Sequence, residues 1–574
     1  MKLVYVEQGV YADSVFLMRL NARLEAEPGV HRALVAMATE ANLDLARMLE
    51  FVVSPAGPDE LLICLDHDGS VPGEELRQLV HRMIREKRGG LGSEETGVVP
   101  TTVMEALQVL PQATLAVISV AGTWAVAEAD KALDAGLSVM LFSDNVTVEQ
   151  EARLKGRALE KGLLMMGPDC GTAIIGGTPL CFSNAVRPGP VGIVAASGTG
   201  LQEVSCLIHR LGSGISHAIG TGGRDLKEPT VSGQMIRAGI AALEADPGTD
   251  VIVVISKPPA DELARALWSD LEGCTKPVVV HLVGGSPSQC PADMRAVLTD
   301  TLAETARAAV GLIGMLDDGG VKPAVLDRSG PAAPQPRRGG IHGLYTGGTL
   351  ADEADGLMRR VPDLEYTVID LGDDQYTRGR AHPMIDPTAR VEWIRKTTAD
   401  TTVAVILLDF VLGYGSHPDP VGMTLPAITG AREGVVFVAA LVGTDGDPQG
   451  YDECLRRLEE AGVLVAGSNA EAVDLAIRQV SNVRSARDDS RGWRTSLHHQ
   501  HQHQHQLQPQ PKPQPRGDTP AQSALLHSPV QVINIGIQDF ADDLQKQGVS
   551  VVHLAWRPPA RGNERMAALL NRLR

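Results

Sequence analysis

The stretch VGIVAASGTGLQEV, residues 191–204, decides the fold class. Its apolar run ends at Ser197-Gly198-Thr199, and a pattern typical of an amphipathic helix follows. A similar shape returns at residues 341–354 as IHGLYTGGTLADEA, and a looser one at 115–129 as LAVISVAGTWAVAEA. A strand that turns through small residues into a helix is the repeating unit of parallel α/β sheets, so we predict such sheets here.

The bulk composition excludes several classes of protein. The 574 residues carry a net charge of −18, which argues against nucleic acid and anionic membranes as partners. No apolar run reaches the roughly 18–20 residues that a membrane span needs. The first residues, MKLVYVEQGVYADS, lack the basic and apolar regions of a signal peptide, and the seven cysteines form no C-x-x-C pair. We therefore expect a cytoplasmic protein with reduced thiols.

Short apolar runs alternate with amphipathic stretches along most of the chain, which predicts several domains. The fold class we expect is α/β, with several doubly wound parallel-sheet domains of Rossmann or flavodoxin-like type and a small amino-terminal α/β sandwich. The predicted units are the sandwich at 1–95, a Rossmann-like domain at 101–185, a flavodoxin-like domain at 187–327, a Pro/Gly/Arg linker at 328–340 and a second flavodoxin-like domain at 341–482.

The last part of the chain differs in composition. Residues 483–528 are rich in His, Gln and Pro and almost free of apolar residues, which predicts a disordered linker. The alternating His and Gln allow weak metal binding, but a passive tether is the simpler interpretation. Residues 529–574 have a β-α-β pattern that is short for an independent fold, so we expect this segment to dock on another domain or on a partner chain.

Two strand-to-helix turns are candidate anion sites. We call Ser197-Gly198-Thr199 the first corner and Gly347-Gly348-Thr349 the second corner. At such a turn the first helical N–H groups are unpaired, small residues permit close approach, and the peptide dipoles favour a phosphate or carboxylate. A capped tight turn explains either corner alone. Two near-copies in successive domains favour function, and we predict that they converge on one oxyanion.

Further candidates follow other predicted strands. Gly222-Gly223-Arg224 could bind a carboxylate or phosphate through the guanidinium, although Arg224 could instead pair with the adjacent aspartate. Asp373, Asp374 and Asp409 could hold Mg²⁺ or could cap turns. No G-x-S-x-G motif and no Cys/His arrangement indicates a catalytic nucleophile, so the catalytic residues stay unassigned.

A longer run, GPDCGTAIIGGTPLCFSNAVRPGPVGIVAASGTGLQEV followed by GISHAIGTGGRDL, resembles the α subunit of succinyl-CoA synthetase. The resemblance covers about residues 112–320. It implies a CoA-binding type of domain at 101–185 and a CoA-ligase type of domain at 187–327. It also makes Asp169 and Cys170 of the GPDC loop candidate substrate-binding residues, although a buried, inert thiol is the simpler interpretation of Cys170.

Residues 341–482 resemble the carboxy-terminal domain of the β subunit of that enzyme. GGTLADEA stands where its Gly-rich turn stands, and VGTDGD makes Gly443 and Thr444 candidate substrate-binding residues. The whole chain is similar to the FdrA family of acyl-CoA synthetase-like proteins through GVYADSVFLMRL, IDLGDDQYTRGRAHPMIDP and LLDFVLGYGSHPDP. The last segment, INIGIQDFADDLQKQGVSVVHLAWRPPA, resembles the start of a protein commonly encoded beside FdrA, which indicates a fusion or an interaction module.

In succinyl-CoA synthetase two such corners, one per subunit, grip a phosphohistidine. The catalytic histidine of that family lies in a G-H-A-G segment, but this chain reads SPSQCPADMRAVL there, and His281 precedes the position. The CoA-phosphate loop G-x-T-G-x-x-G and an ATP-grasp domain are also missing, so nucleotide activation would need a partner subunit encoded nearby.

Three functions remain open. The first is an acid–thiol ligase-like enzyme that handles a phosphorylated small carboxylate without a phosphohistidine. The second is a subunit of a carbamoyltransferase that uses oxamate and carbamoyl phosphate in allantoin or purine catabolism. The third is a non-catalytic scaffold or regulator. CoA, a nucleotide and Mg²⁺ are possible cofactors, and the resemblance does not decide among them.

Overall fold

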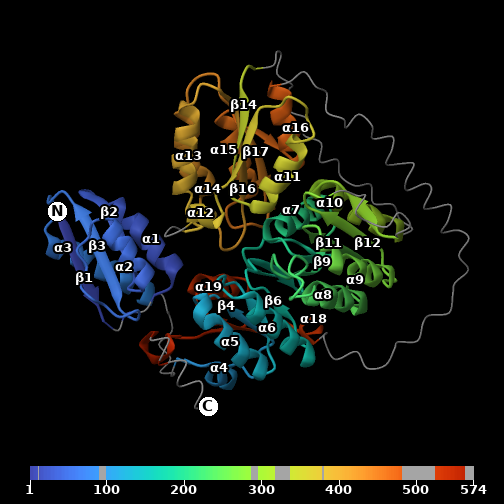
Figure 1. Cartoon of the computed structure of the whole chain (residues 1–574), viewed down its shortest axis with the longest axis horizontal. Helices are drawn as coiled ribbons and strands as arrows, with labels where there is room; N and C mark the ends of the chain where they lie inside the picture. Colours follow the sequence, from blue (N-terminus) through green and yellow to red (C-terminus); the bar gives the residue numbers. More distant parts are fainter. Residues whose placement is uncertain are drawn as a thin grey trace, which may run out of the picture.

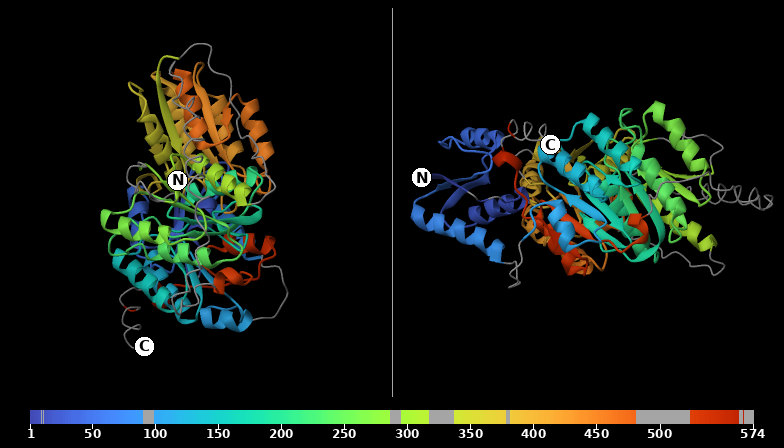
Figure 2. Two further views of the ribbon diagram at one scale, coloured as in Figure 1. Left: turned by 90° about the vertical axis from the view of Figure 1, so that its right-hand side faces the viewer. Right: turned by 90° about the horizontal axis from the view of Figure 1, so that it is seen from below.

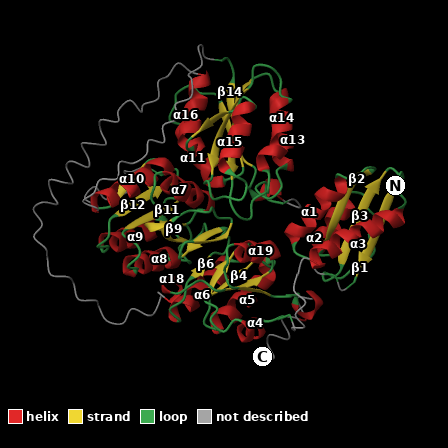
Figure 3. Ribbon diagram, turned by 180° about the vertical axis from the view of Figure 1, so that it is seen from behind, coloured by secondary structure: helices red, strands yellow, loops and turns green. Residues whose placement is uncertain are grey.

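The computed structural model describes residues 1–8, 10, 12–89, 99–285, 295–316, 337–377, 381–480, 524–562 and 566. These residues form four sheets, of three, seven, five and five strands, in units that Figure 1 shows side by side. Helices flank the parallel sheets, as Figure 3 shows from behind, so the predicted α/β class is confirmed. None of the helices in these ranges is long and apolar enough to cross a membrane.

The amino-terminal unit forms a three-stranded sheet in the order β1-β3-β2. Both of its pairings are antiparallel, unlike those of a parallel βαβ sheet, because β3 inserts between β1 and β2. The helices cover the two faces and bury separate apolar clusters. The elements are β1 (Lys2–Glu7), α1 (Ser14–Glu25), β2 (Val30–Met37), α2 (Glu40–Met48), β3 (Leu61–His67) and α3 (Gly73–Gly89).

The second sheet is built from two distant parts of the chain. Its order is β20-β19-β4-β5-β6, with all pairings parallel. The last segment therefore lies beside the second unit, as both views of Figure 2 show in red. The elements are α4 (Val103–Val109), β4 (Leu115–Ile118), α5 (Gly122–Asp134), β5 (Ser138–Leu141), α6 (Val148–Glu160), β6 (Met165–Met166), α18 (Ala524–His527), β19 (Val532–Ile535), α19 (Gln538–Lys546) and β20 (Val551–His553). Residues 524–527, placed in the linker by the sequence, form α18, whereas 483–523 lie outside the described residues.

The third sheet has the order β13-β12-β11-β9-β10-β7-β8. The hairpin β7–β8, which the sequence assigned to the second unit, pairs here because Ile174 of β7 is antiparallel to Ala218 of β10. The other pairings are parallel. The elements are β7 (Thr172–Ile175), β8 (Thr178–Cys181), β9 (Pro188–Ala195), α7 (Gly198–Arg210), β10 (Ile215–Gly220), α8 (Gln234–Ala245), β11 (Val251–Ser256), α9 (Asp261–Glu272), β12 (Val278–Leu282), β13 (Val297–Thr299) and α10 (Leu302–Leu316).

The fourth sheet is parallel throughout, in the order β15-β14-β16-β17-β18. Alternate residues of β16 face opposite sides, so Val405 and Leu407 join one core cluster while Ile406 and Leu408 join another. The elements are β14 (Gly340–Tyr345), α11 (Gly348–Met358), β15 (Tyr366–Asp370), α12 (Asp374–Thr377), α13 (Thr388–Ala399), β16 (Val403–Val411), α14 (Pro420–Thr429), β17 (Val436–Val442), α15 (Tyr451–Glu460), β18 (Leu464–Ala466) and α16 (Asn469–Val480).

A reciprocal exchange of helix caps joins the third and fourth units. Glu203 of α7 accepts a hydrogen bond from the backbone N–H of Asn469, the first residue of α16, at 2.9 Å. Glu353 of α11 accepts one from Leu302, the first residue of α10, at 2.8 Å. Both glutamates are buried and follow the two corners at equivalent positions. Each unit therefore caps a helix of the other, which fixes how the corners face each other.

Candidate functional site

The two corners meet across the boundary between the third and fourth units. Ser197 Oγ lies 2.6 Å from Thr349 Oγ1. A Cβ atom built on Gly347 would lie only 2.8 Å from Thr199 Cγ2. Ser197 and Gly347 are the N-cap residues of α7 and α11. The positive ends of two helix dipoles therefore lie next to each other, an arrangement that favours an anion between them.

The local chemistry of the first corner explains its shape. Ser197 has extended backbone angles, and its Oγ accepts a hydrogen bond from the N–H of Gly200 at 3.0 Å. A Cβ atom built on Gly200 would lie 2.5 Å from that Oγ, so this position has no room for a side chain. A Cβ atom on Gly198 would meet Thr172 Oγ1 at 3.2 Å. Gly198 therefore has more room than Gly200.

The second corner is held by a buried ion pair. Asp409, at the end of β16, accepts hydrogen bonds from the backbone N–H groups of Thr346 and Gly347, each at 2.8 Å. Arg390 lies 3.6 Å from Asp409 Oδ1 and donates to Thr346 Oγ1 at 3.0 Å. Burial raises the pKa of Asp409, and the neighbouring guanidinium opposes this shift. Because both carboxylate oxygens accept hydrogen bonds from the corner, we assign Asp409 a structural role, and its role as a metal ligand stays a prediction.

A cleft of about 1510 Å³ surrounds the two corners and is lined by all four units. The first corner contributes Ser197, Gly198 and Thr199, and the second contributes Gly348 and Thr349. The amino-terminal unit lines it with residues that include 34–40, and the last segment lines it with Gly536, Ile537, Trp556 and Pro558. The cleft is large enough for a ligand of the size of a cofactor.

Charged groups of both signs line the cleft beside the second corner. Lys257, directly after β11, pairs with Asp352 at 2.7 Å. Burial raises the pKa of Asp370 to about 6, and the carboxylates of Asp409, Asp373 and Asp352 add to this shift. Asp370 Oδ2 lies 2.7 Å from the position that a Cβ atom on Gly348 would take. The carboxyl of Asp370 is therefore close enough to the second corner to oppose an anion there when it is charged.

One histidine lies in the same wall. His382 lines the cleft, and its Nδ1 accepts a hydrogen bond from the N–H of Met384 at 3.2 Å. Burial and the guanidinium of Arg390 lower the pKa of His382 to about 4. His382 is therefore a neutral ring at pH 7 that presents Nε2 toward the loop of Gly372, whose Cβ position would be 2.6 Å away.

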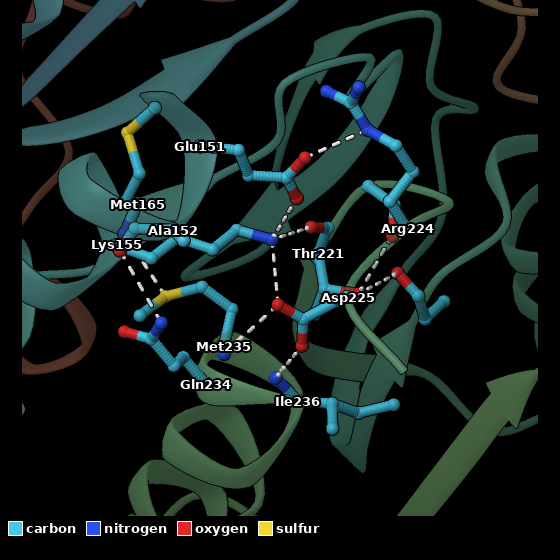
Figure 4. A network of polar contacts seen from close by, with 12 residues as sticks. Glu151, Ala152, Lys155, Met165, Thr221, Arg224, Asp225, Gln234, Met235 and Ile236 are labelled. Atoms are coloured by element: carbon cyan, nitrogen blue, oxygen red, sulfur yellow. Dashed lines mark hydrogen bonds and ion pairs between the residues drawn. The ribbon is translucent and has the colours of Figure 1, made fainter. Parts of the chain in front are cut away.

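Arg224, which the sequence predicted to bind a ligand, is held by a protein group. Its Nε lies 2.8 Å from Glu151 of α6 (Figure 4). The fully buried Lys155 joins the same network through Glu151 at 2.7 Å and Asp225 at 2.6 Å. Asp225 also accepts the N–H of Ile236 at 2.7 Å. This network joins the second and third units, so we assign Arg224 a structural role.

The neighbouring glycines differ in their surroundings. Gly222 has a φ of +81°, and a Cβ atom there would lie 2.3 Å from the carbonyl oxygen of Pro168. Gly223 lines the cleft and has open space around its Cα. Of this predicted trio, the structure therefore brings Gly223 to the cleft but neither Gly222 nor Arg224.

The two candidate substrate-binding residues of the GPDC loop also differ in their surroundings. Asp169, with a φ of 56°, lines the cleft. Cys170 is buried, its Sγ donates to the carbonyl of Thr172 at 3.6 Å, and burial raises its pKa to about 12. A thiol with that pKa is not a nucleophile at pH 7. The inert alternative for Cys170 is therefore the one that the geometry supports.

Gly443 and Thr444 lie at a contact between units, not in the cleft. Thr444 Oγ1 donates to the carbonyl of Ala185 at 2.6 Å, and its N–H donates to Asp447 at 2.8 Å. Asp447 also accepts the N–H of Ala185 at 2.7 Å. These contacts fix the segment before β9, so the predicted substrate role of Gly443 and Thr444 lacks geometric support.

Metal ligands were predicted at Asp373, Asp374 and Asp409. Asp373 lines the cleft, and the side chain of Asp374 lies outside the described residues. Within the described ranges, no group of three or more His, Cys, Asp or Glu side chains could hold a metal ion. His281 is buried in β12, with Nδ1 3.0 Å from the carbonyl oxygen of Thr299, and does not line the cleft. Residues 286–294, where the synthetase family has its histidine, lie outside the described residues.

Comparison with known proteins gives the family. YahF, an uncharacterized protein of Escherichia coli (strain K12), is 40% identical over 509 residues, which span 82% of this chain and 97% of YahF. The chain belongs to the YahF family. Within it, residues 344–478 match the CoA-ligase family, and residues 1–98 match the AllF heavy metal-associated domain.

Two further relatives cover parts of this YahF-family chain. The malate–CoA ligase α subunit of Methylorubrum extorquens is 30% identical over 206 residues, or 34% of this chain and 66% of that subunit. YahG of Escherichia coli (strain K12) is 44% identical over 50 residues, or 9% of this chain and 11% of YahG. The relationship to CoA-ligase α subunits that the sequence predicted is therefore confirmed.

The residues of the amino-terminal unit do not fit a soft metal ion. Sites for such ions use thiolates, commonly in pairs. Cys64 is the one cysteine in the sequence of residues 1–98. It is fully buried in the central strand β3, and burial raises its pKa to about 12. The matched domain therefore supplies a wall of the cleft, with no thiolate pair for a heavy metal.

Sequence reasoning did not select Lys257 or Asp352 as site residues, and it considered Asp370 only as part of the Asp-rich run 370–374 that could hold Mg²⁺. Lys257 and Asp370 stand at the carboxyl ends of the parallel strands β11 and β15, which is where α/β sheets gather ligand groups. That position was a usable signal. Asp352 lies within α11, and nothing in the local pattern marks it.

Proposed function

We propose that this protein is an acyl-CoA synthetase-like enzyme that binds a phosphorylated small carboxylate in the cleft. In this proposal the phosphoryl group lies between the N-termini of α7 and α11. The observation that supports it most strongly is the 2.6 Å contact between Ser197 and Thr349, which places two helix dipoles at one point. The confirmed CoA-ligase relationship supports the same class of chemistry.

The proposed reaction is attack on an acyl phosphate. A thiol sulfur forms a bond to the acyl carbon, and the carbon–oxygen bond to phosphate breaks. The phosphate leaves with that electron pair, and the thiol proton passes to it. The N–H groups of the two corners stabilise the charge that develops on the leaving phosphate. The ammonium group of Lys257 adds positive charge at the same wall.

No phosphohistidine takes part in this proposal. His382, the histidine that we describe in the cleft wall, accepts the N–H of Met384 with Nδ1 and presents Nε2 to the loop of Gly372. We assign it a positioning role for the loop of Gly372. The phosphorylated compound would then arrive from outside, made by a partner that activates the acid with a nucleotide.

A carbamoyltransferase subunit remains the second candidate, as a member of an FdrA-type complex. Carbamoyl phosphate is also a mixed anhydride, and attack by the nitrogen of oxamate on its carbonyl carbon would release phosphate from the same corners. The match of residues 1–98 to the AllF domain favours this candidate. The two candidates share the leaving group and differ in the acceptor.

A ligand series separates the candidates. The unfolding temperature of the full chain would be measured with CoA, ATP, inorganic phosphate and carbamoyl phosphate. We expect stabilisation by phosphate and by CoA for the ligase. Stabilisation by carbamoyl phosphate without CoA would favour the transferase. No response to any of the four compounds would contradict both and would indicate the scaffold.

A further inference from the structure

The second sheet depends on a segment that is distant in sequence. Val532 of β19 pairs with Leu115 of β4, and Ile535 pairs with Ile118. The carbonyl of Gln531 accepts the N–H of Thr114 at 2.9 Å, and that of Ile535 accepts the N–H of Ser119 at 2.8 Å. Without β19 this edge of β4 would present a row of unpaired backbone groups.

The segment also supplies a wall of the cleft. From β19 the chain runs through α19 to β20 on one side, and from β4 it runs through α5 to β5 on the other. The chain thus leaves the adjacent strands β19 and β4 toward opposite edges of the sheet. This arrangement opens a crevice at the carboxyl ends of these two strands. There the N–H of Ile537 donates to Ser119 Oγ at 2.7 Å, and Gly536 has a φ of +127° that brings it against Ser119.

The last segment packs on the rest of the chain through buried apolar side chains, a contact between aromatic rings and an ion pair. The buried Val532, Ile533, Phe540 and Leu544 join the core cluster of the second and third units. Phe540 packs at 5.1 Å from the ring of Phe142, and Asp539 pairs with an arginine of the amino-terminal unit. Burial of such side chains stabilises by about 1.5–3 kcal/mol each. The segment therefore buries enough apolar surface to stay bound at this edge of the sheet without a covalent connection.

A separate protein carries a related segment. The match to YahG covers 50 residues and 11% of YahG, a length close to that of residues 524–574, and we assign it to this segment. The same strand–helix–strand unit can therefore belong to this chain or to another polypeptide.

We propose that the edge of β4 that β19 covers is a docking site for a β-α-β segment that need not be covalently attached. In this chain the site is filled by its own residues 530–556. The partner it fits is a polypeptide that carries a YahG-like β-α-β unit, which adds two strands to the sheet and completes the cleft. The covalent connection to the rest of the chain raises the local concentration of the segment.

The test uses the full chain with a specific protease site inserted between residues 490 and 515. After cleavage we expect the two pieces to elute together in native size-exclusion chromatography. Val532→Asp, which puts a charge at a fully buried position, should release the small piece after cleavage. Gln545→Asp, at an exposed position of the same segment, should not. Separation of the cleaved wild-type pieces, or retention in Val532→Asp, would overturn the proposal.

A second measurement does not rely on variants. A labelled peptide of residues 524–574, added in excess, should enter the cleaved protein and should be excluded from the uncleaved one. Equal incorporation into both, or none into the cleaved protein, would contradict docking at a defined site. Because neither readout involves a ligand of the cleft, a failure here leaves the proposed function untouched.

Discussion

Ser197 and Thr349, 152 positions apart in sequence, place their hydroxyl oxygens 2.6 Å apart at the N-termini of two helices. The contact joins the third and fourth units at the wall of the cleft. The exchanged caps of Glu203 and Glu353 hold the helices in that relation. The anion site that we propose therefore rests on a tertiary contact that has its own measurable energy.

The hydroxyl contact predicts coupling between the two residues. Ser197→Ala and Thr349→Val should each lower the free energy of unfolding by about 1 kcal/mol. The double variant should lose less than the sum, because the first substitution already removes the shared hydrogen bond, with a coupling of about 0.5 kcal/mol or more. Urea unfolding of the four proteins measures this. Strict additivity would mean that the hydroxyls do not interact.

The buried contacts of Asp409 predict that its substitution lowers the free energy of unfolding strongly. Asp409→Ala leaves the buried Arg390 without its partner and two backbone N–H groups of the second corner unpaired, so unfolding should become easier by about 3–5 kcal/mol. Asp270→Ala removes an ion pair with Arg237 at the surface and should cost about 1 kcal/mol or less. Chemical denaturation of both variants checks this. Equal small losses would contradict the structural role of Asp409.

The raised pKa of Asp370 predicts that anion binding depends on pH. Above pH 6 this carboxyl is charged and repels an anion at Gly348, and below pH 6 it becomes neutral. Sulfate, which stays a dianion over this range, should therefore bind more tightly as the pH falls from 7 to 5. In Asp370→Asn the affinity should be higher at pH 7 and nearly independent of pH. Isothermal titration measures both, and an unchanged slope in the variant would refute the role of Asp370.

Glu203 predicts a pH-dependent loss of stability. Burial raises the pKa of Glu203 to about 7 in the folded protein, above its ordinary value. A raised pKa means that the protonated form is favoured by folding, so its contribution is complete at low pH and is lost as the pH rises through 7. Glu203→Gln should remove this part of the pH dependence. Glu460→Gln, at an exposed position, serves as the control and should leave the pH profile of unfolding unchanged.

Local pattern was enough to predict the α/β class and the strands that lead into both corners. The apolar runs before Ser197 and Gly347 are β9 and β14, and the amphipathic stretches after them are α7 and α11. Small residues at a strand end have a local cause, since the chain must turn tightly into a helix. That is why this feature can be read from one short stretch.

Contacts between residues that are distant in sequence could not be predicted from local pattern. Arg224 looked available for a ligand, but Glu151, which holds it, is far away in sequence. Gly443 and Thr444 stand at a strand end, yet they contact Ala185 of another unit. The place of residues 530–556 in the second sheet is likewise decided by an open edge of β4, which no local pattern of either segment contains.

The most direct test of the account is sulfate and phosphate binding by Gly198→Val and Gly348→Val. In the proposed site, a branched side chain at either position would occupy the place of the anion. Gly356→Val, on α11 with open space around its Cβ position, would not. The account predicts that either corner variant loses ligand-dependent stabilisation while its unfolding without ligand stays cooperative, and that Gly356→Val binds normally. Normal binding by both corner variants would contradict the claim that the two corners share one oxyanion.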